Sequence, residues 1–377
     1  MGRCSLPHPA GGAGDGQVEE EVQPAGEAGE GHLAEAVLPA AVGPGDPLRP
    51  EGGDGNEQGT DAVRSDVGHE RDIRVAARYR VPRYDTEMSH TTRLKRSPGT
   101  FRQLTGITPD AFDRVLAELE PRYREAEARR KTRRPRRRKP GAGPKHTLDL
   151  GDRLLMLLMY YRTYTTHAFL GFLFALDDSS VGRNINPLQP LLAGIFRIPE
   201  RRVALEPDEI RELFFDATER PIPRPTRGQK GYYSGKKKRH TVKHQVVVVR
   251  KRKAPGRAGQ RRRVRIAAVS AAFPGKTHDK KVYDRTRVTC PPGVKRTGDT
   301  AYQGTGLTTP RRKPRKGELT PRQKAGNRRV SRRRIVVGHG IGKMKVWRIA
   351  AERYRNPRRC HTLMMKNVAG LHNLMFA

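Results

Sequence analysis

Apolar residues recur at a helical spacing over most of residues 100–200. Thr108 can cap a helix whose first residue is Pro109. The apolar face of that helix would be formed by Phe112, Val115, Leu116 and Leu119. Residues 148–164 predict a second, buried helix with an inner stripe of Leu154, Leu155, Leu158 and Tyr161. The pattern therefore predicts an all-α region.

Residues 166–192 predict a helix, a short turn and a second helix. Asp178 or Ser179 can cap the second helix, and Pro187 limits its length. Near its start we place the polar residues Arg183, Asn184 and Asn186. A helix-turn-helix would present these side chains to a major groove. Helices packed for structural reasons alone would show the same pattern, and we favour DNA readout.

After Pro207 the apolar spacing becomes strand-like. Strands rich in Val, Ile and Phe are predicted over residues 211–218, 243–251, 263–273 and 293–302. Residues 278–288 predict a short helix, and one or two long basic helices are expected from about Arg322 onward. The order of strands and helices over residues 207–377 is typical of an α/β RNase H-like nuclease domain.

The first 87 residues differ sharply from the rest of the chain. They contain 8 basic and 17 acidic residues, whereas the remaining residues raise the net charge of the whole chain to +38. This acidic segment, rich in Gly, Pro and Ala, cannot bury enough apolar surface to order itself, so we expect disorder. It is either a regulatory tail or, as we favour, an upstream extension of a chain that starts at Met88.

The strong positive charge of residues 88–377 favours a nucleic-acid partner. Charge alone would suit an RNA-binding protein equally well. Residues 128–145 form a basic, Pro- and Gly-containing linker, which is either a solvated loop or, as we favour, a contact for DNA phosphates. The sequence has no apolar stretch of about 18 residues that could span a membrane. Three scattered cysteines fit no zinc spacing and indicate reduced thiols in a cytosol.

Two aspartates lie at or just past the ends of predicted strands. Asp216 follows an apolar run, and Asp299 lies 83 residues later. Side chains at strand ends can leave the sheet and meet at its edge. Carboxylates are the ligands that Mg²⁺ requires, and two such ions can cleave a phosphodiester bond by in-line displacement. The pair therefore predicts a metal-dependent site.

Five segments resemble the DDE transposases of bacterial insertion sequences, which are allied to the Harbinger-like superfamily. They read DATERPIPRP, YYSGKKKRHTVKHQ, AAFPGKTHDKKVYD, GDTAYQG and VVGHGIGKMKVWRI. The resemblance covers residues 100–377 and implies that Asp216 and Asp299 are the first two catalytic acids, binding Mg²⁺ or Mn²⁺. The third acid in the family is a glutamate immediately before a histidine. Here Gly338 precedes His339, so we expect a catalytically impaired copy.

Another acid could replace the missing glutamate only under strict geometric conditions. Glu352 would lie about 21 Å further along a continuous helix, which is too far. His339 points about 100° around the helix and is a poor magnesium ligand. Glu318 would need its loop to fold back. Asp279 caps or orients the helix that follows it, as we favour, or lies near the metals.

Residues around the expected site suit contact with DNA. The segment after the first strand could grip the backbone and stack on an unpaired base, or be a solvated turn; its residues are Tyr232, Tyr233, Lys236, Lys237, Lys238 and His240. Phosphates along one face of the last basic helix would meet Arg328, Arg329, Arg332, Arg333 and Arg334. Trp347 is expected in the core.

The resemblance implies a transposase that binds terminal inverted repeats through residues 108–195. It would cut double-stranded DNA and join the 3′-hydroxyl to target DNA. A homodimer or larger synaptic assembly in the cytoplasm, associated with the nucleoid, is expected. The alternative is a non-catalytic DNA-binding protein that occupies the element ends and represses transposition.

Overall fold

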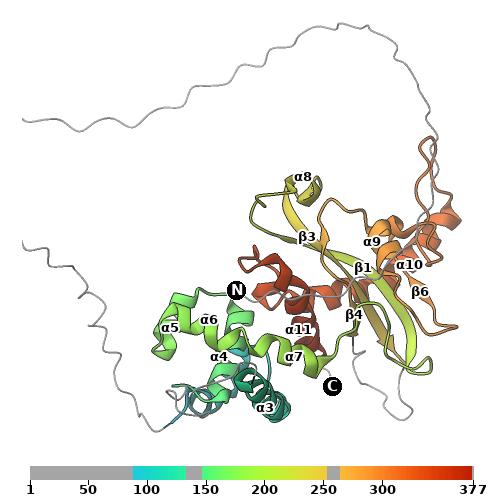
Figure 1. The fold of residues 1–377 in the computed structure, drawn as a ribbon. Coiled ribbons are helices and arrows are strands. Elements are labelled where there is room, and N and C mark those ends of the chain that lie inside the picture. The colour runs from blue at the N-terminus through green and yellow to red at the C-terminus, as the bar shows by residue number, and fades with distance from the viewer. Residues whose placement is uncertain (1–87, 133–146, 253–263, 376–377) are drawn as a thin grey trace, which may run out of the picture. The chain divides into compact units, whose positions relative to one another are not determined.

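The computed structural model describes residues 88–132, 147–252 and 264–375. The expected disordered segment 1–87 and residues 133–145 of the expected basic linker lie outside this part of the chain. Helices dominate up to Phe196 and a mixed α/β domain follows (Figure 1). The helices of the first region are α1 (His90–Lys95), α2 (Pro98–Thr105), α3 (Pro109–Thr132), α4 (Leu150–Thr163), α5 (His167–Phe174), α6 (Asp178–Ile185) and α7 (Leu188–Phe196).

Helix α3 begins where the sequence predicts. The Thr108 hydroxyl accepts a hydrogen bond from the Ala111 N–H at 3.3 Å, and Phe112 is fully buried. The helix runs on to Thr132, so the prediction that residues 128–132 belong to a linker is wrong. Ion pairs at i,i+4 spacing, such as Arg129 with Glu125 at 2.5 Å, support the helix in this stretch.

The α5–α6 pair has the predicted helix-turn-helix order, but the cap differs. Asp177, rather than Asp178 or Ser179, accepts a hydrogen bond from the Ser180 N–H at 2.8 Å. The helix ends at Ile185; Asn186 still has helical φ and ψ, but Pro187 has no backbone N–H to continue the hydrogen-bond pattern.

The three polar residues expected near the start of α6 therefore lie at its other end. Arg183 and Asn184 are in the last turn, and Asn186 follows it. The Asn184 amide donates to the Ser180 carbonyl at 2.9 Å, so this side chain is bonded within its own helix. Arg183 is exposed.

A mixed sheet forms the centre of the second region. Its elements are β1 (Ile210–Pro221), α8 (Gln229–Tyr232), β2 (Tyr233–Ser234), β3 (Arg239–Lys251), β4 (Val264–Val269), β5 (Phe273–Pro274), α9 (Asp279–Thr286), β6 (Arg296–Thr297), α10 (Pro321–Met344) and α11 (His361–Leu374). Strand β3 pairs antiparallel with β1 on one side and with β4 on the other, and β6 adds parallel to β1. The expected strand over residues 263–273 is thus divided between β4 and β5.

The two faces of the sheet bury different cores, as period-two alternation requires. Phe214 and Val248 pack with the helices of the first region and with α10 and α11. Phe215 and Val247 face the other core, beneath Tyr302. The long basic helix expected near Arg322 is α10, which begins with a capping box of Thr320 and Gln323. Trp347 is buried, as predicted.

No helix in the described ranges is long and apolar enough to cross a membrane.

A buried histidine pair joins β3 to α11. His244 Nε2 lies 2.7 Å from His361 Nδ1, and the rings stack with centroids 4.9 Å apart. His244 Nδ1 lies 2.8 Å from the Ser270 carbonyl oxygen. Burial lowers the pKa of His244 to about 4 and that of His361 to about 2.

We predict that the protein loses stability as pH falls from 7 to 5. An unfolded imidazole takes up a proton near pH 6.5, whereas the buried rings stay neutral, so acid favours the unfolded chain. The expected loss is about 1–2 kcal/mol for each ring, measured by urea unfolding at both pH values. His361→Gln should reduce the pH dependence. An unfolding free energy that stays constant between pH 7 and 5 would contradict the prediction.

Candidate active site

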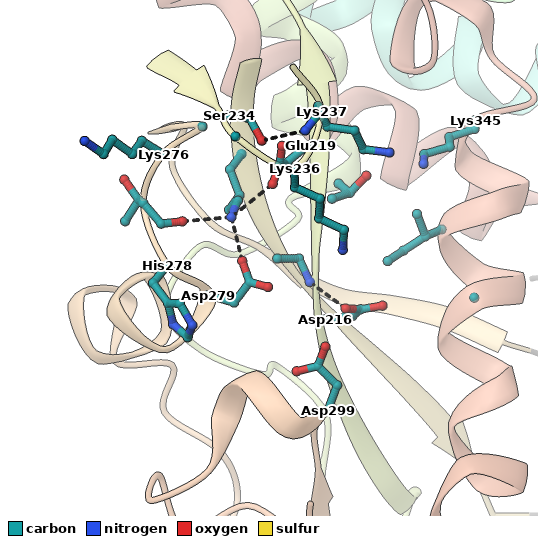
Figure 2. Close-up of a pocket in the computed structure, with 18 of the residues that line it drawn as sticks. Asp216, Glu219, Ser234, Lys236, Lys237, Lys276, His278, Asp279, Asp299 and Lys345 are labelled. Carbon is teal, nitrogen blue, oxygen red and sulfur yellow. Dashed lines mark hydrogen bonds and ion pairs between the residues drawn. The ribbon is translucent and has the colours of Figure 1, made fainter. Parts of the chain in front are cut away.

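A polar pocket of about 600 Å³ opens where β1, α9 and α10 meet (Figure 2). One part of its wall is formed by residues 216–219 of β1 and by residues 234–237, which include the end of β2 and the turn after it. The rest is formed by residues 275–279 before and at the start of α9, by Asp299, and by the face of α10 that includes Gly338. The two predicted catalytic aspartates thus line one pocket, together with Gly338, the position at which the third acid is expected.

The parallel pairing of β1 with β6 brings Asp216 and Asp299 together, although 83 residues separate them in the sequence. Phe214 is the partner of Thr297 in the ladder. Asp216 lies two residues beyond Phe214 and Asp299 two residues beyond Thr297, so the register places the aspartates beside each other. The expectation that Asp216 ends its strand is wrong: β1 continues to Pro221 because β3 extends alongside it.

Burial and neighbouring charge shift the acidity of Asp216. Burial raises its pKa, and the charges of Asp299 and Asp279 raise it further. A hydrogen bond from the Ala217 N–H at 2.9 Å and the charge of Arg334 act in the opposite direction. A cation in the pocket would relieve this repulsion between carboxylates.

Asp299 is held by local backbone geometry. Its carboxylate accepts from the Ala301 N–H at 2.9 Å, capping a short 3₁₀ turn of residues 300–302. Arg334 Nη2 lies 4.0 Å from the other carboxylate oxygen. Arg334 is on α10, one turn before Gly338, so both positions share the face of the helix that meets the pocket.

Gly338 leaves open space at the pocket. A Cβ atom built there meets no other heavy atom within 4 Å, leaving aside the glycine's chain neighbours and the helix's own backbone. At Gly340, by contrast, a Cβ would lie 3.2 Å from Val264 Cγ1. Position 338 can therefore hold a longer side chain.

The proposed substitutes for the third acid lie elsewhere. His339 and Glu318 are exposed, and Glu318 pairs with Lys324 at 2.8 Å. Glu352 lies beyond the end of α10 and pairs with Arg348. Within the described residues, no group of three or more His, Cys, Asp or Glu side chains is arranged to hold a metal ion.

A buried lysine beside the aspartates was not predicted. Lys243 Nζ lies 2.7 Å from Asp279 Oδ1 and 3.1 Å from Glu219 Oε1, and it donates to the Thr277 carbonyl at 2.8 Å. Burial lowers the pKa of Lys243, but its hydrogen bonds and ion pairs with Asp279 and Glu219 outweigh burial and raise it. Glu219 and Lys243 are direct cross-strand partners, which only the register of β1 and β3 reveals.

Asp279 lies in the pocket, so the preferred expectation that it caps α9 is wrong. The cap is His278, whose Nδ1 accepts from the Lys280 N–H at 3.3 Å. Figure 2 shows Asp279 on the pocket wall near Asp216 and Asp299, and its Oδ1 lies 2.7 Å from Lys243 Nζ.

Only some of the expected DNA-contact residues lie at the pocket. Lys236 and Lys237 line the pocket, and Lys238 occupies the turn with a φ of 51°. Tyr232 and Tyr233 lie at the junction of α8 and β2, and Tyr233 is opposite His240.

The three arginines at the middle of α10 point in different directions, because successive helical residues are turned by about 100°. Arg332 is exposed. Arg333 instead pairs with buried Glu212 at 2.5 Å, and Arg334 faces Asp299. The expectation that they share one phosphate-binding face is therefore wrong, as the structure assigns each a different environment.

Two models of one protein superfamily match consecutive parts of the chain. Residues 215–373 match the DDE superfamily endonuclease, and residues 146–197 match the helix-turn-helix of DDE superfamily endonuclease. The chain belongs to the DDE superfamily transposases of insertion sequences.

Two curated relatives extend the match over most of the chain. One is named as a transposase for insertion sequence element IS702 of Microchaete diplosiphon; it is 28% identical over 74% of this chain and 94% of its own length. The other is named as a transposase for insertion sequence element IS112 of Streptomyces albus G, at 28% identity over 74% of this chain and 95% of its own length. No solved structure matches.

We predict that Gly338→Ala stabilises the protein more than Gly340→Ala does. Removing a mid-helix glycine contributes roughly 0.5–1 kcal/mol to the free energy of unfolding. At position 340 the new methyl group crowds Val264 and Val248, which offsets the gain. Urea unfolding monitored by circular dichroism gives both values. Equal or greater stabilisation from Gly340→Ala would contradict the prediction, because it would show that a methyl group at position 340 is not crowded.

Proposed function

We propose that this protein is an insertion-sequence transposase whose copy here is catalytically impaired. It would bind the terminal inverted repeats, cut DNA with Mg²⁺ or Mn²⁺, and join the 3′-hydroxyl to target DNA. The observation that carries the proposal is the convergence of Asp216, Asp299 and the open position 338 on one pocket.

The strand order supports an RNase H-like assignment for residues 207–377. Strands β4, β3 and β1 are neighbours in antiparallel pairing, and β6 adds parallel to β1. This order, with a long helix closing over the sheet, is the one expected for such a nuclease. The alliance with the Harbinger-like superfamily stays a prediction from the sequence motifs.

The donor set suits a divalent metal ion but is incomplete. Asp216 and Asp299 offer carboxylate oxygens, the ligand type that Mg²⁺ prefers. Such an ion would activate the attacking hydroxyl and stabilise the leaving oxygen during in-line displacement. Gly338 offers no ligand, so fewer negative charges are left to hold the ion. Arg334, whose guanidinium lies 4.0 Å from Asp299, weakens the pull on a cation further.

DNA binding is assigned to two surfaces. The α5–α6 pair would contact DNA through the exposed Arg183 and Asn186 at the C-terminal end of α6. Lys236, Lys237 and Lys345 border the carboxylate pocket and would bind phosphates there. Action on two DNA ends implies a homodimer or larger synaptic assembly, and action on the bacterial chromosome implies a nucleoid-associated, cytoplasmic protein.

A second function is favoured by the same incomplete site. A chain that keeps its DNA-binding surfaces but lacks an effective metal site could occupy the element ends and repress intact copies. Sequence-specific binding without metal-dependent cleavage separates this function from residual transposition.

We predict that Gly338→Glu restores Mg²⁺-dependent cleavage of a duplex carrying the element's own end. The chain with Gly338 should cut at least about 100-fold more slowly, because loss of a direct ligand exceeds the usual effect of outer-sphere changes. Single-turnover rates measured on a labelled duplex provide the comparison.

Two matched variants complete this experiment. Gly338→Gln has the same length without the charge and should stay inactive, as should Asp216→Asn combined with Gly338→Glu. Equal cleavage by the unaltered chain and by the Gly338→Glu variant would contradict the assignment of position 338. Binding without cleavage by every variant would favour the repressor.

A further inference from the structure

A second pocket of about 410 Å³ adjoins the carboxylate pocket. Its lining residues are Gln229, Lys230, Tyr233, Gly235, His240 and Lys276. Gly235 and Lys276 also line the carboxylate pocket, so the two pockets share a wall. Figure 2 shows Lys276 at the rim of the carboxylate pocket. A strand whose phosphate lies at the aspartates therefore has its neighbouring nucleotide within reach of the second pocket.

Tyr233 supplies an accessible aromatic ring in this pocket. Tyr233 is 44% exposed, and two further aromatic residues among the described ones, Phe169 and Phe172, are also exposed. Tyr233 and His240 are opposite each other in the β2–β3 ladder, and their rings meet at 74° with centroids 5.6 Å apart. The hairpin fixes the position of the ring, so a ligand that stacks on it orders little additional structure.

The adjacent Tyr232 is a natural comparison, because its ring is already covered. The Arg358 guanidinium carbon lies 4.7 Å from its centroid, and the ring packs against the larger hydrophobic core. The rings of the two consecutive tyrosines thus differ in environment. The Tyr232 ring contacts a guanidinium group and the core, whereas the Tyr233 ring is accessible to a ligand.

The chemistry around Tyr233 suits a nucleotide. Lys230 and Lys276 supply positive charge for phosphates on either side of a base. Gln229 is oriented by Arg224, whose Nε donates to its amide oxygen at 2.8 Å. Both faces of a paired base are covered by its neighbours in the duplex. Only a base displaced from the stack can lie on an aromatic ring in a side pocket.

We propose that the pocket formed by Tyr233, His240 and Lys276 binds one unpaired nucleobase next to a phosphate that Lys236 and Lys237 hold in the carboxylate pocket. Tyr233 stacks on the base, and the lysines hold the flanking phosphates. Stacking on a ring tolerates any base, so the pocket selects for an unpaired nucleotide and not for a sequence. The proposal rests on the proposed function, because it requires DNA at the carboxylate pocket.

The test compares the affinity of the full chain for two labelled duplexes of the same sequence, one fully paired and one with a single unpaired nucleotide. Binding is measured by fluorescence anisotropy at fixed salt in Ca²⁺, which avoids any dependence on cleavage. The chain should prefer the duplex with the unpaired nucleotide. Tyr233→Ala should weaken binding of that duplex by about 5- to 100-fold. Its affinity for the paired duplex should change less than twofold.

Control variants separate stacking from folding. Tyr233→Phe keeps the ring and should keep the preference, and Tyr232→Ala should leave the preference intact. All variants are first compared by thermal unfolding, and Tyr233→Leu, which keeps an apolar side chain without the aromatic ring, replaces Tyr233→Ala if that variant unfolds early.

Each outcome decides one question. Equal affinity of the unaltered chain for the two duplexes overturns the base pocket while leaving the proposed function in place. Equal weakening of binding to both duplexes by Tyr233→Ala also overturns it, since this result would show that Tyr233 contacts the DNA backbone. Failure to bind either duplex contradicts the proposed function itself.

Discussion

The buried carboxylate of Glu212 ties together the three elements that form the site. On β1 it accepts a hydrogen bond from Thr297 of β6 at 2.7 Å, and it pairs with Arg333 of α10 at 2.5 Å. A buried charge without partners is very unfavourable, so these contacts fix the two strands and the helix in one arrangement. Gly338 lies five residues after Arg333, and its place over the pocket follows from this anchor. The site depends on the register of these elements more than on any residue inside it.

Opposing charges then determine what the site can do. Asp216 and Asp299 lie side by side, and burial makes their mutual repulsion costly. Lys243 pairs with Asp279 and Glu219, so its single positive charge offsets part of theirs, and the charges of the two predicted catalytic aspartates are left to a metal ion or to Arg334. A third acid at position 338 would shift that balance toward the metal. In the proposed function, the absence of this acid would lower the capacity for cleavage and leave the DNA-binding surface in place, a combination that suits both an impaired transposase and a repressor.

Much of this organisation is visible in the sequence, because strong periodicity determines where helices and strands occur. The Val-rich run of β3, the capped start of α3 and the two separated aspartates are of this kind. Tertiary register is not local information. The pairing of Glu219 with Lys243 requires knowing how β1 aligns with β3, and the inward turn of Arg333 requires knowing where Glu212 lies. The cap at Asp177 was missed because three consecutive polar residues could each serve, and backbone geometry chose the first.

The most direct test of this account is the affinity of the protein for Mn²⁺, measured from the electron paramagnetic resonance signal of the free ion. With glutamate at position 338, the account predicts saturable Mn²⁺ binding at least about tenfold tighter than in the Gly338 chain. It also predicts that this gain is lost when Asp216 or Asp299 is changed to asparagine. Equal Mn²⁺ affinity with Gly and Glu at position 338, or a gain that survives without the aspartates, would contradict the claim that these three positions form one metal site.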